Sequence, residues 1–151
     1  MQLSRNCAQA IRRAQMIAKG NGSVALLPEH LIAGLLEKEN SATHFLRSAG
    51  VPPEEVRHEI MTEIRKTATR ANVEKTWQTN SWKILMNKAA ANAKRGERMS
   101  ISALDLLAAF DSLDGTLEYI FELCKVAYQK LADFLAELER WALSKPTPAI
   151  A

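Results

Sequence analysis

Histidine and cysteine are the residues of this sequence whose side chains could bind a metal or act as a nucleophile. The chain has three histidines, His30, His44 and His58, and two cysteines, Cys7 and Cys124. The histidines would lie on three different predicted helices, without the short spacing within one helix that zinc sites use. Both cysteines fall in apolar helical patterns, where thiols are buried and inert. We therefore expect free thiols, no metal, no cofactor, and a structural role for His30 at a helix start.

A phosphate-binding loop is also missing from the sequence. No segment has the pattern G-x-x-x-x-G-K-[ST], whose glycine-rich backbone and lysine hold nucleotide phosphates. Together with the absence of an activated nucleophile, this predicts that the chain is not an enzyme.

Charged residues of opposite sign are concentrated in two consecutive segments. Residues 83–98 contain Glu97 and five basic residues: Lys83, Lys88, Lys94, Arg95 and Arg98. Residues 101–123 contain no basic residue and five acidic ones: Asp105, Asp111, Asp114, Glu118 and Glu122. Such runs are usually solvated faces, and the alternative is a dipolar surface that orients a partner protein. Nucleic-acid binding, which would weaken steeply with salt, is disfavoured because neither a docking helix nor stacking aromatics accompany the charge.

The composition is typical of one soluble helical domain. The 151 residues are 47% hydrophobic and 25% charged, with only 6 glycines and 5 prolines, which favours helices around a sizeable core. No stretch approaches the roughly 20 apolar residues of a membrane span, and the N-terminus has no apolar signal region. We expect an all-α, cytoplasmic protein without membrane contact.

The chain matches itself without a gap at a shift of 75 positions, which lays Ser4 on Thr79. The shift aligns similar residues along both halves, including Ala14 with Ala89, Ala18 with Ala93, Leu31 with Leu106, Val51 with Val126, and Ile60 with Leu135. Apolar positions at a constant offset indicate that both halves bury the same faces. We predict eight helices in two pseudo-symmetric four-helix repeats, related by a pseudo-twofold axis.

Helix-start signals give the boundaries of these units. Ser4 and Thr79 are suited to cap the first helices, while Pro28 and the Ser-x-x-Asp pattern from Ser102 to Asp105 begin the second. Third helices are predicted over residues 42–49 and 116–125, and fourth helices after residues 52–53 and near residue 128. The domain, residues 1–143, then divides into repeat one (1–65), a connector (66–78) and repeat two (79–143), followed by a flexible tail or linker (144–151).

The beginning of the second predicted helix resembles a known signature. Residues 28–36, Pro-Glu-His-Leu-Ile-Ala-Gly-Leu-Leu, are similar to the Glu-His-Leu-Leu-x-x-Leu-Leu pattern of Clp N-terminal repeats. Residues 46–51 resemble the Leu-x-x-x-Gly-Val segment that follows in that family, and residues 100–110 look like the divergent second repeat of ClpA- or ClpB-type chaperones. The resemblance covers residues 1–143 and points to the double Clp N-terminal domain of Hsp100 unfoldases.

The resemblance implies a protein-binding function. In that family the double repeat is tethered to AAA+ ATPase modules and binds unfolded polypeptides or adaptor proteins. It implies unfolded or tagged substrates or adaptors as partners of this chain, and AAA+ Clp ATPase modules in cis or in trans. The alternative to such a receptor domain is a stand-alone regulatory subunit that docks on a Clp assembly.

The same resemblance implies candidate contact residues. In ClpC-like relatives the glutamate at the position of Glu29 helps to bind phosphorylated arginine, but Leu104 stands at the equivalent position of the second half. The paired site is thus lost or halved, and Glu29 is alternatively a helix N-terminus stabiliser. In ClpB-like relatives a leucine at the position of Leu104 lines an apolar groove. We predict a groove between the halves formed by Leu104, Asn87 and Ala91, with core packing of Leu104 as the alternative.

Overall fold

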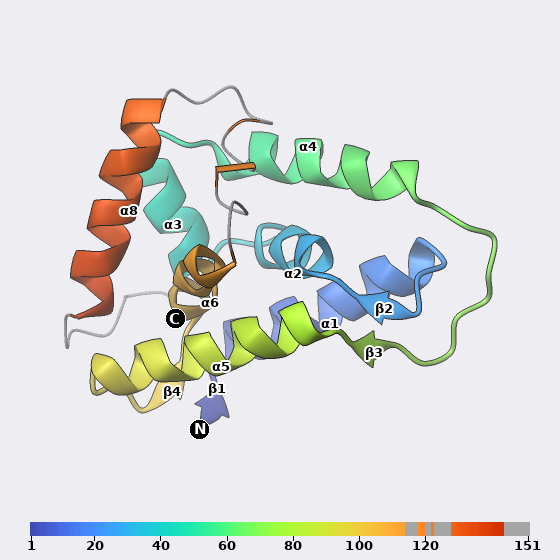
Figure 1. Ribbon diagram of the computed structural model, residues 1–151, viewed down its shortest axis with the longest axis horizontal. Coiled ribbons are helices and arrows are strands. Elements are labelled where there is room, and N and C mark those ends of the chain that lie inside the picture. Colours follow the sequence, from blue (N-terminus) through green and yellow to red (C-terminus); the bar gives the residue numbers. More distant parts are fainter. Residues whose placement is uncertain (114–117, 120–121, 123–127, 144–151) are drawn as a thin grey trace.

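The computed structural model describes residues 1–113, 118–119, 122 and 128–143, and most of these residues are helical (Figure 1). The helices are α1 (Arg5–Gly20), α2 (Pro28–Leu35), α3 (Ser41–Ser48), α4 (Pro53–Lys66), α5 (Asn80–Arg95), α6 (Ala103–Ala109), the 3-10 helix η1 (Phe110–Ser112) and α8 (Tyr128–Ala142). The predicted helical fold class is confirmed. Cys124, most of the predicted helix over residues 116–125, and the predicted tail, residues 144–151, lie outside the described residues.

Short polar side chains begin the long helices where the sequence predicted them. Ser4 Oγ accepts a hydrogen bond from Cys7 N at 3.1 Å, and Thr79 Oγ1 accepts one from Trp82 N at 3.3 Å, so both predicted caps are confirmed. Proline opens α2 and α4, where its missing N–H has no helical partner to lose. Gly50 follows α3 with a φ of 79°, a left-handed conformation that favours glycine after a helix.

Two short parallel sheets join the halves of the chain. β1 (Gln2–Leu3) pairs with β4 (Ser100–Ile101), and β2 (Ala25–Leu26) pairs with β3 (Trp77–Gln78). The helix caps add to these links, because Ser4 N donates to Ile101 O at 2.8 Å and Thr79 Oγ1 donates to Leu26 O at 2.7 Å. The predicted connector, residues 66–78, therefore ends in a strand that binds the first half.

Equivalent elements recur at one spacing along the chain. The shift that lays Ser4 on Thr79 also carries both bounds of α1 onto those of α5, β1 onto β3, and β2 onto β4. It carries the first residues of α2 and α4 onto those of α6 and α8 as well.

Small residues allow α1 to lie close against α2. Ala10 and Ala14 of α1 are fully buried. A Cβ atom at Gly34 of α2 would lie 2.6 Å from Ala10 O and 2.8 Å from Ala14 N, so this approach of two backbones requires glycine.

Helix α6 lies between α3, α5 and α8 and contacts all three (Figure 1). Helix α8 also packs against α3, where the rings of Phe45 and Phe134 meet edge to face at 5.4 Å. This arrangement places α8 beside the C-terminal end of α5. No helix in the described part of the chain is long and apolar enough to cross a membrane.

Candidate functional site

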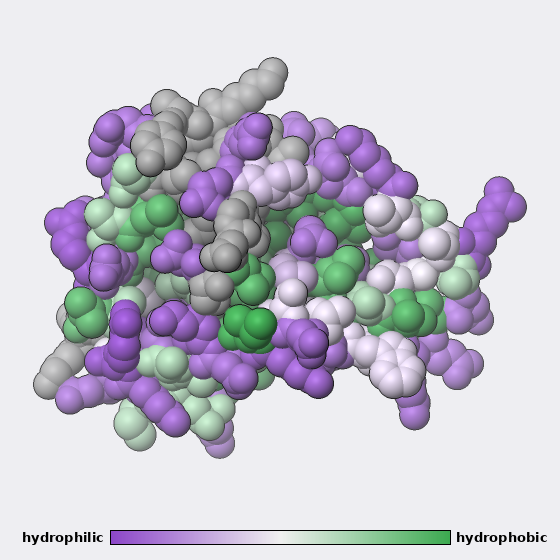
Figure 2. Space-filling view, in the orientation of Figure 1, coloured by the Kyte–Doolittle hydropathy of each residue, from purple (hydrophilic) through white to green (hydrophobic). Residues whose placement is uncertain are grey.

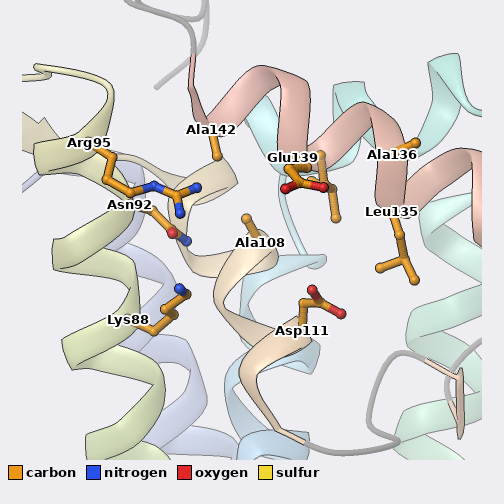
Figure 3. Close-up of a pocket in the computed structure, with 10 residues that line it drawn as sticks. Lys88, Asn92, Arg95, Ala108, Asp111, Leu135, Ala136, Glu139 and Ala142 are labelled. Carbon is orange, nitrogen blue, oxygen red and sulfur yellow. The ribbon is translucent and has the colours of Figure 1, made fainter.

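A pocket of about 430 Å³ opens between α5, α8 and the C-terminal end of α6 (Figure 3). Its lining comes from α5 (Lys88, Asn92, Arg95), from α6 and η1 (Ala108, Asp111), and from α8 (Leu135, Ala136, Leu138, Glu139, Ala142). The volume falls within the range of about 300–1,000 Å³ that is typical of ligand pockets. Small side chains such as Ala108, Ala136 and Ala142 leave this space open.

The walls of the pocket carry charges of opposite sign. Lys88 and Arg95 project from α5, and Asp111 and Glu139 lie across the pocket on η1 and α8 (Figure 3). Within the described part of the chain, no ion pair joins these cations to these carboxylates. A bound group can therefore bring donors to one wall and acceptors to the other.

Asn92 adds an uncharged polar group to this pocket. The residue is only 2% exposed, and its amide nitrogen donates to Asp105 O at 3.4 Å. No hydrogen bond to its amide oxygen comes from any described residue. A donor from a ligand would satisfy that oxygen, which would otherwise depend on water.

A buried ion pair fixes the helices around the pocket. Arg98 Nη2 lies 2.6 Å from Asp105 Oδ1, and the two side chains are 3% and 0% exposed. Asp105 Oδ2 also accepts hydrogen bonds from Ser102 N at 3.0 Å and from Ser102 Oγ at 3.1 Å, which confirms the predicted capping box. The Arg98 guanidinium lies 4.1 Å from the centre of the Trp141 ring. The cluster thereby connects α6 to α8.

The interpretation of Arg98 and Asp105 as charges of a solvated or dipolar surface was wrong. The packing of α5 and α6 buries both residues, and each neutralises the charge of the other. The basic surface of residues 83–98 is correspondingly smaller, which further weakens the case for nucleic-acid binding.

The first half has a smaller pocket at the equivalent place. Its volume is about 210 Å³, and it is lined by Ile17, Gly20, Asn21, Met61, Ile64 and Arg65. In the aligned halves, four of these residues correspond to pocket residues of the second half: Ile17 to Asn92, Gly20 to Arg95, Met61 to Ala136 and Ile64 to Glu139. The same crevice is therefore mainly apolar in the first half and charged in the second.

Leu104 is not exposed. It is 3% accessible, and its backbone N–H donates to Ser41 Oγ of α3 at 3.1 Å. Its burial follows from the packing of α3 over the start of α6. The alternative of core packing describes its place in this structure.

The other predicted contact residues do not join Leu104 in a groove. Asn87 and Ala91 are exposed on α5, opposite the helix face that buries Leu85 and Ala89. Glu29 is half-buried in the first turn of α2, and this burial raises the pKa of its carboxyl group, while a backbone hydrogen bond acts in the opposite direction. On the face seen in Figure 2, apolar residues form separate patches among polar ones.

The residues considered for metal binding and catalysis have structural surroundings. His30 is 2% exposed and its Nδ1 accepts from Leu27 N at 3.1 Å, which confirms its predicted role at the start of α2; burial lowers its pKa. Burial, with a smaller effect of Asp105, raises the pKa of the Cys7 thiol to about 12. Among the described residues, no three His, Cys, Asp or Glu side chains are grouped as metal ligands.

Sequence reasoning missed most of the pocket. The sequence does indicate the pocket through differences between the aligned halves. Gly20 and Ile64 of the first half are replaced by the charged residues Arg95 and Glu139 in the second. These two charges have opposite signs and lie on helices that are distant in the chain. The sequence does not show that they are close in space, because this depends on α5 and α8 lying side by side.

Comparison with known proteins identifies the family. The family described as "Clp repeat (R) N-terminal domain" matches residues 2–138. The chain belongs to this family. The resemblance seen in the sequence is thereby confirmed, and among curated proteins none matches this Clp N-terminal domain.

Solved structures agree with this assignment. The Hsp104 N-terminal domain from Candida albicans has 15% identity over 97% of each chain, with a TM-score of 0.77. The N-terminal domain of ClpD from Arabidopsis thaliana has 15% identity over 93% of this chain and 96% of that one, with a TM-score of 0.67. A complex of the ClpV N-domain with a VipB peptide has 16% identity, covers 95% of this chain and 83% of that one, and has a TM-score of 0.65. At these identities the likeness shows the shared fold.

Proposed function

We propose that this Clp N-terminal domain is a protein-binding module that receives substrate or adaptor segments for an ATP-dependent Clp/Hsp100 chaperone or protease. The observation that carries the proposal is the pocket between α5 and α8, which has two oppositely charged walls and apolar side chains between them. A relative, the ClpV N-domain, is described in complex with a VipB peptide, which supports a peptide as ligand.

The pocket suits a short polypeptide segment. A peptide backbone carries both N–H donors and carbonyl acceptors. In a segment lying between the walls, carbonyl groups can accept hydrogen bonds from the cations of α5, and N–H groups can donate to the carboxylates opposite them. Leu135 and Leu138 offer apolar contact beneath it. A pocket of this size provides few contacts to offset the entropy of association, so we expect micromolar or weaker affinity, about −8 kcal/mol or less in magnitude.

We further propose that the two halves are copies of one four-helix unit. The constant spacing between equivalent helices and strands, as between the starts of α1 and α5, supports this. The finer division into repeat one (1–65), connector (66–78) and repeat two (79–143), with an eighth helix at residues 116–125, belongs to the same proposal.

The partners proposed for the module are unfolded or tagged proteins or adaptors, with AAA+ Clp modules acting in cis or in trans in the cytoplasm. A stand-alone regulatory subunit docking on a Clp assembly is the second candidate. It would use an exposed surface such as the outer face of α5, where Asn87 and Ala91 lie. The predicted contacts of Glu29 and Leu104 with a partner remain proposals, and Leu104 would require α3 to move away from α6.

Two tryptophan variants test the proposed function. Ala136→Trp places a large ring at an exposed position of the pocket lining, whereas Ala91→Trp makes the same change on the outer face of α5. Binding of a fluorescently labelled, permanently unfolded model protein is measured by anisotropy, and binding to purified Clp ATPases by co-sedimentation. We expect Ala136→Trp to abolish binding of the unfolded protein and Ala91→Trp to preserve it.

Other results have distinct meanings. Loss only in Ala91→Trp would move the binding site to the outer face of α5. Wild-type protein that binds ATPase but no unfolded protein or adaptor would favour the regulatory subunit. Wild-type protein that binds none of them would refute the proposed function.

A further inference from the structure

Two arginine side chains bond the C-terminal end of α2 in the first half. Arg13 Nε donates to Gly34 O at 2.9 Å, and Arg57 Nε donates to Ala33 O at 3.2 Å. Glu37 lies between the guanidinium groups, 3.3 Å from Arg13 Nε and 3.6 Å from Arg57 Nη2. The carbonyl oxygens at the C-terminal end of α2 are thus satisfied by guanidinium groups that a shared carboxylate neutralises.

The second half has an open pocket at the equivalent helix end and lacks one of these arginines. In the aligned halves, Lys88 corresponds to Arg13, and Ala108 corresponds to Ala33. Arg57, however, is replaced by Ala132, an exposed residue on α8. The alanine side chain is too short to reach the end of α6, where the pocket of about 430 Å³ opens.

A carboxylate is nevertheless present beside this open crevice. Asp111 lines the pocket just beyond the C-terminal end of α6, where the first half has the apolar Leu36. At this helix end Lys88 and Asp111 supply one cation and one carboxylate, while Arg95 and Glu139 add a second pair of opposite charges to the pocket. One added guanidinium beside Lys88 and Asp111 would resemble the arrangement at the end of α2, where Arg13 and Arg57 lie around Glu37.

We propose that the pocket between α5 and α8 binds an arginine side chain of a partner polypeptide, in the place that Arg57 fills in the first half. This inference rests on the proposed function and names the ligand of the same site. The guanidinium group lies between Asp111 and Glu139, with N–H groups toward the C-terminal end of α6 and the amide oxygen of Asn92. The stem of the side chain lies along Leu135.

The chemistry of the pocket favours arginine over other charged groups. A guanidinium group offers five N–H donors in one plane and can bond a carboxylate and a carbonyl oxygen together, whereas a lysine ammonium acts as a compact point charge. The end of α6 also carries the negative end of the helix dipole. Lys88 does not prevent this binding, because Arg13 and Arg57 lie beside the same carboxylate in the first half.

Peptides that differ in one side chain test the proposal. Labelled nonapeptides of glycine, alanine and serine carry arginine, citrulline, lysine or glutamate at the centre, and their dissociation constants are measured with the full chain at low salt. Citrulline has the shape of arginine without its charge. We expect the arginine peptide to bind at least about tenfold more tightly than the citrulline peptide, as charge-assisted hydrogen bonds warrant.

Two variants locate the effect in the pocket. Ala132→Arg restores the guanidinium of the first half within the chain and should abolish binding of the arginine peptide, while Ala71→Arg adds the same charge to the exposed segment after α4 and should leave binding unchanged. Asp111→Asn should reduce the preference for arginine over citrulline at least about tenfold, because it removes the carboxylate. Ala132 and Asp111 are both exposed, and circular dichroism verifies folding.

The outcomes separate this inference from the proposed function. Equal binding of the arginine and citrulline peptides, tighter binding of the glutamate peptide, or unchanged binding in Ala132→Arg would overturn the arginine site, even if unfolded proteins still bind. An arginine preference that disappears in Ala132→Arg supports the site. If that preference is found but neither unfolded proteins nor Clp ATPases bind, the arginine site stands and the proposed function fails.

Discussion

Removing the charge of Asp105 should destabilise the domain strongly, because the buried guanidinium of Arg98 would lose the carboxylate that neutralises it. Asp105→Asn keeps the size of the side chain and can still accept a hydrogen bond from Ser102. It removes the negative charge 2.6 Å from Arg98 Nη2, in a place where the two side chains are 3% and 0% exposed. Breaking a buried ion pair on one side costs about 3–5 kcal/mol.

The retained hydrogen bonds place Asp105→Asn near the lower end of that range, about 3 kcal/mol. For a domain of this size, that loss corresponds to a decrease of roughly 6–12 °C in the midpoint of thermal unfolding. Urea unfolding followed by far-UV circular dichroism at pH 7 measures the change, and an unaltered slope with denaturant indicates that only stability has changed.

Two further variants make this prediction specific. Glu137→Gln removes the partner of Arg140 in an exposed ion pair of α8 and should change stability little. The double variant Arg98→Met with Asp105→Asn removes both charges and should recover most of the loss, because no uncompensated buried charge remains. A loss below about 1 kcal/mol in Asp105→Asn would refute the reasoning, since it would mean that water or another group already compensates Arg98.

Two other predictions concern the first half. Gly34→Ala should lower the free energy of unfolding by about 2 kcal/mol, because its Cβ would lie 2.6 Å from Ala10 O. A Cβ at Gly20 would have open space around it, so the control Gly20→Ala should be neutral or stabilising. Equal urea midpoints for the two variants would contradict the close contact of α1 and α2. Because burial lowers the pKa of His30, its folded form resists protonation, so the stability it contributes is complete above the unfolded pKa of about 6.5 and decreases as the pH falls below it. His30→Gln should flatten this dependence between pH 7 and 5 in urea titrations, and the same slope in wild type, His30→Gln and the exposed control His58→Gln would contradict it.

Local chemistry explains which parts of the fold could be predicted from the sequence. A cap such as Ser4 or Thr79 accepts a hydrogen bond from an N–H only three residues away, and Gly50 adopts a left-handed φ that its own residue type favours. The residue type alone is therefore enough to predict these helix ends. His30 likewise bonds the backbone three residues before it. Apolar positions repeated along one helix face, as at Ala10 and Ala14, predicted the buried side of α1 in the same way.

Only the tertiary structure decided which charged and apolar side chains meet solvent. The sequence pattern suggested that Asp105 and Arg98 are surface charges, but the packing of α6 against α5 buries them as a pair. Leu104 occupied a position suited to a binding groove, yet α3, which is distant in sequence, covers it through Ser41. Exposure depends on the neighbouring elements, and a residue's own type and local pattern do not contain that information.

The pocket depends on the tertiary structure for the same reason. Arg95 and Glu139 come from helices far apart in the chain and oppose each other only after α8 lies beside α5. The sequence by itself determined the helices, their caps and the family, because these follow from contacts a few residues long or from repeated motifs. The charged crevice required the packing of α8, since its walls are built from two surfaces that no local interaction brings together.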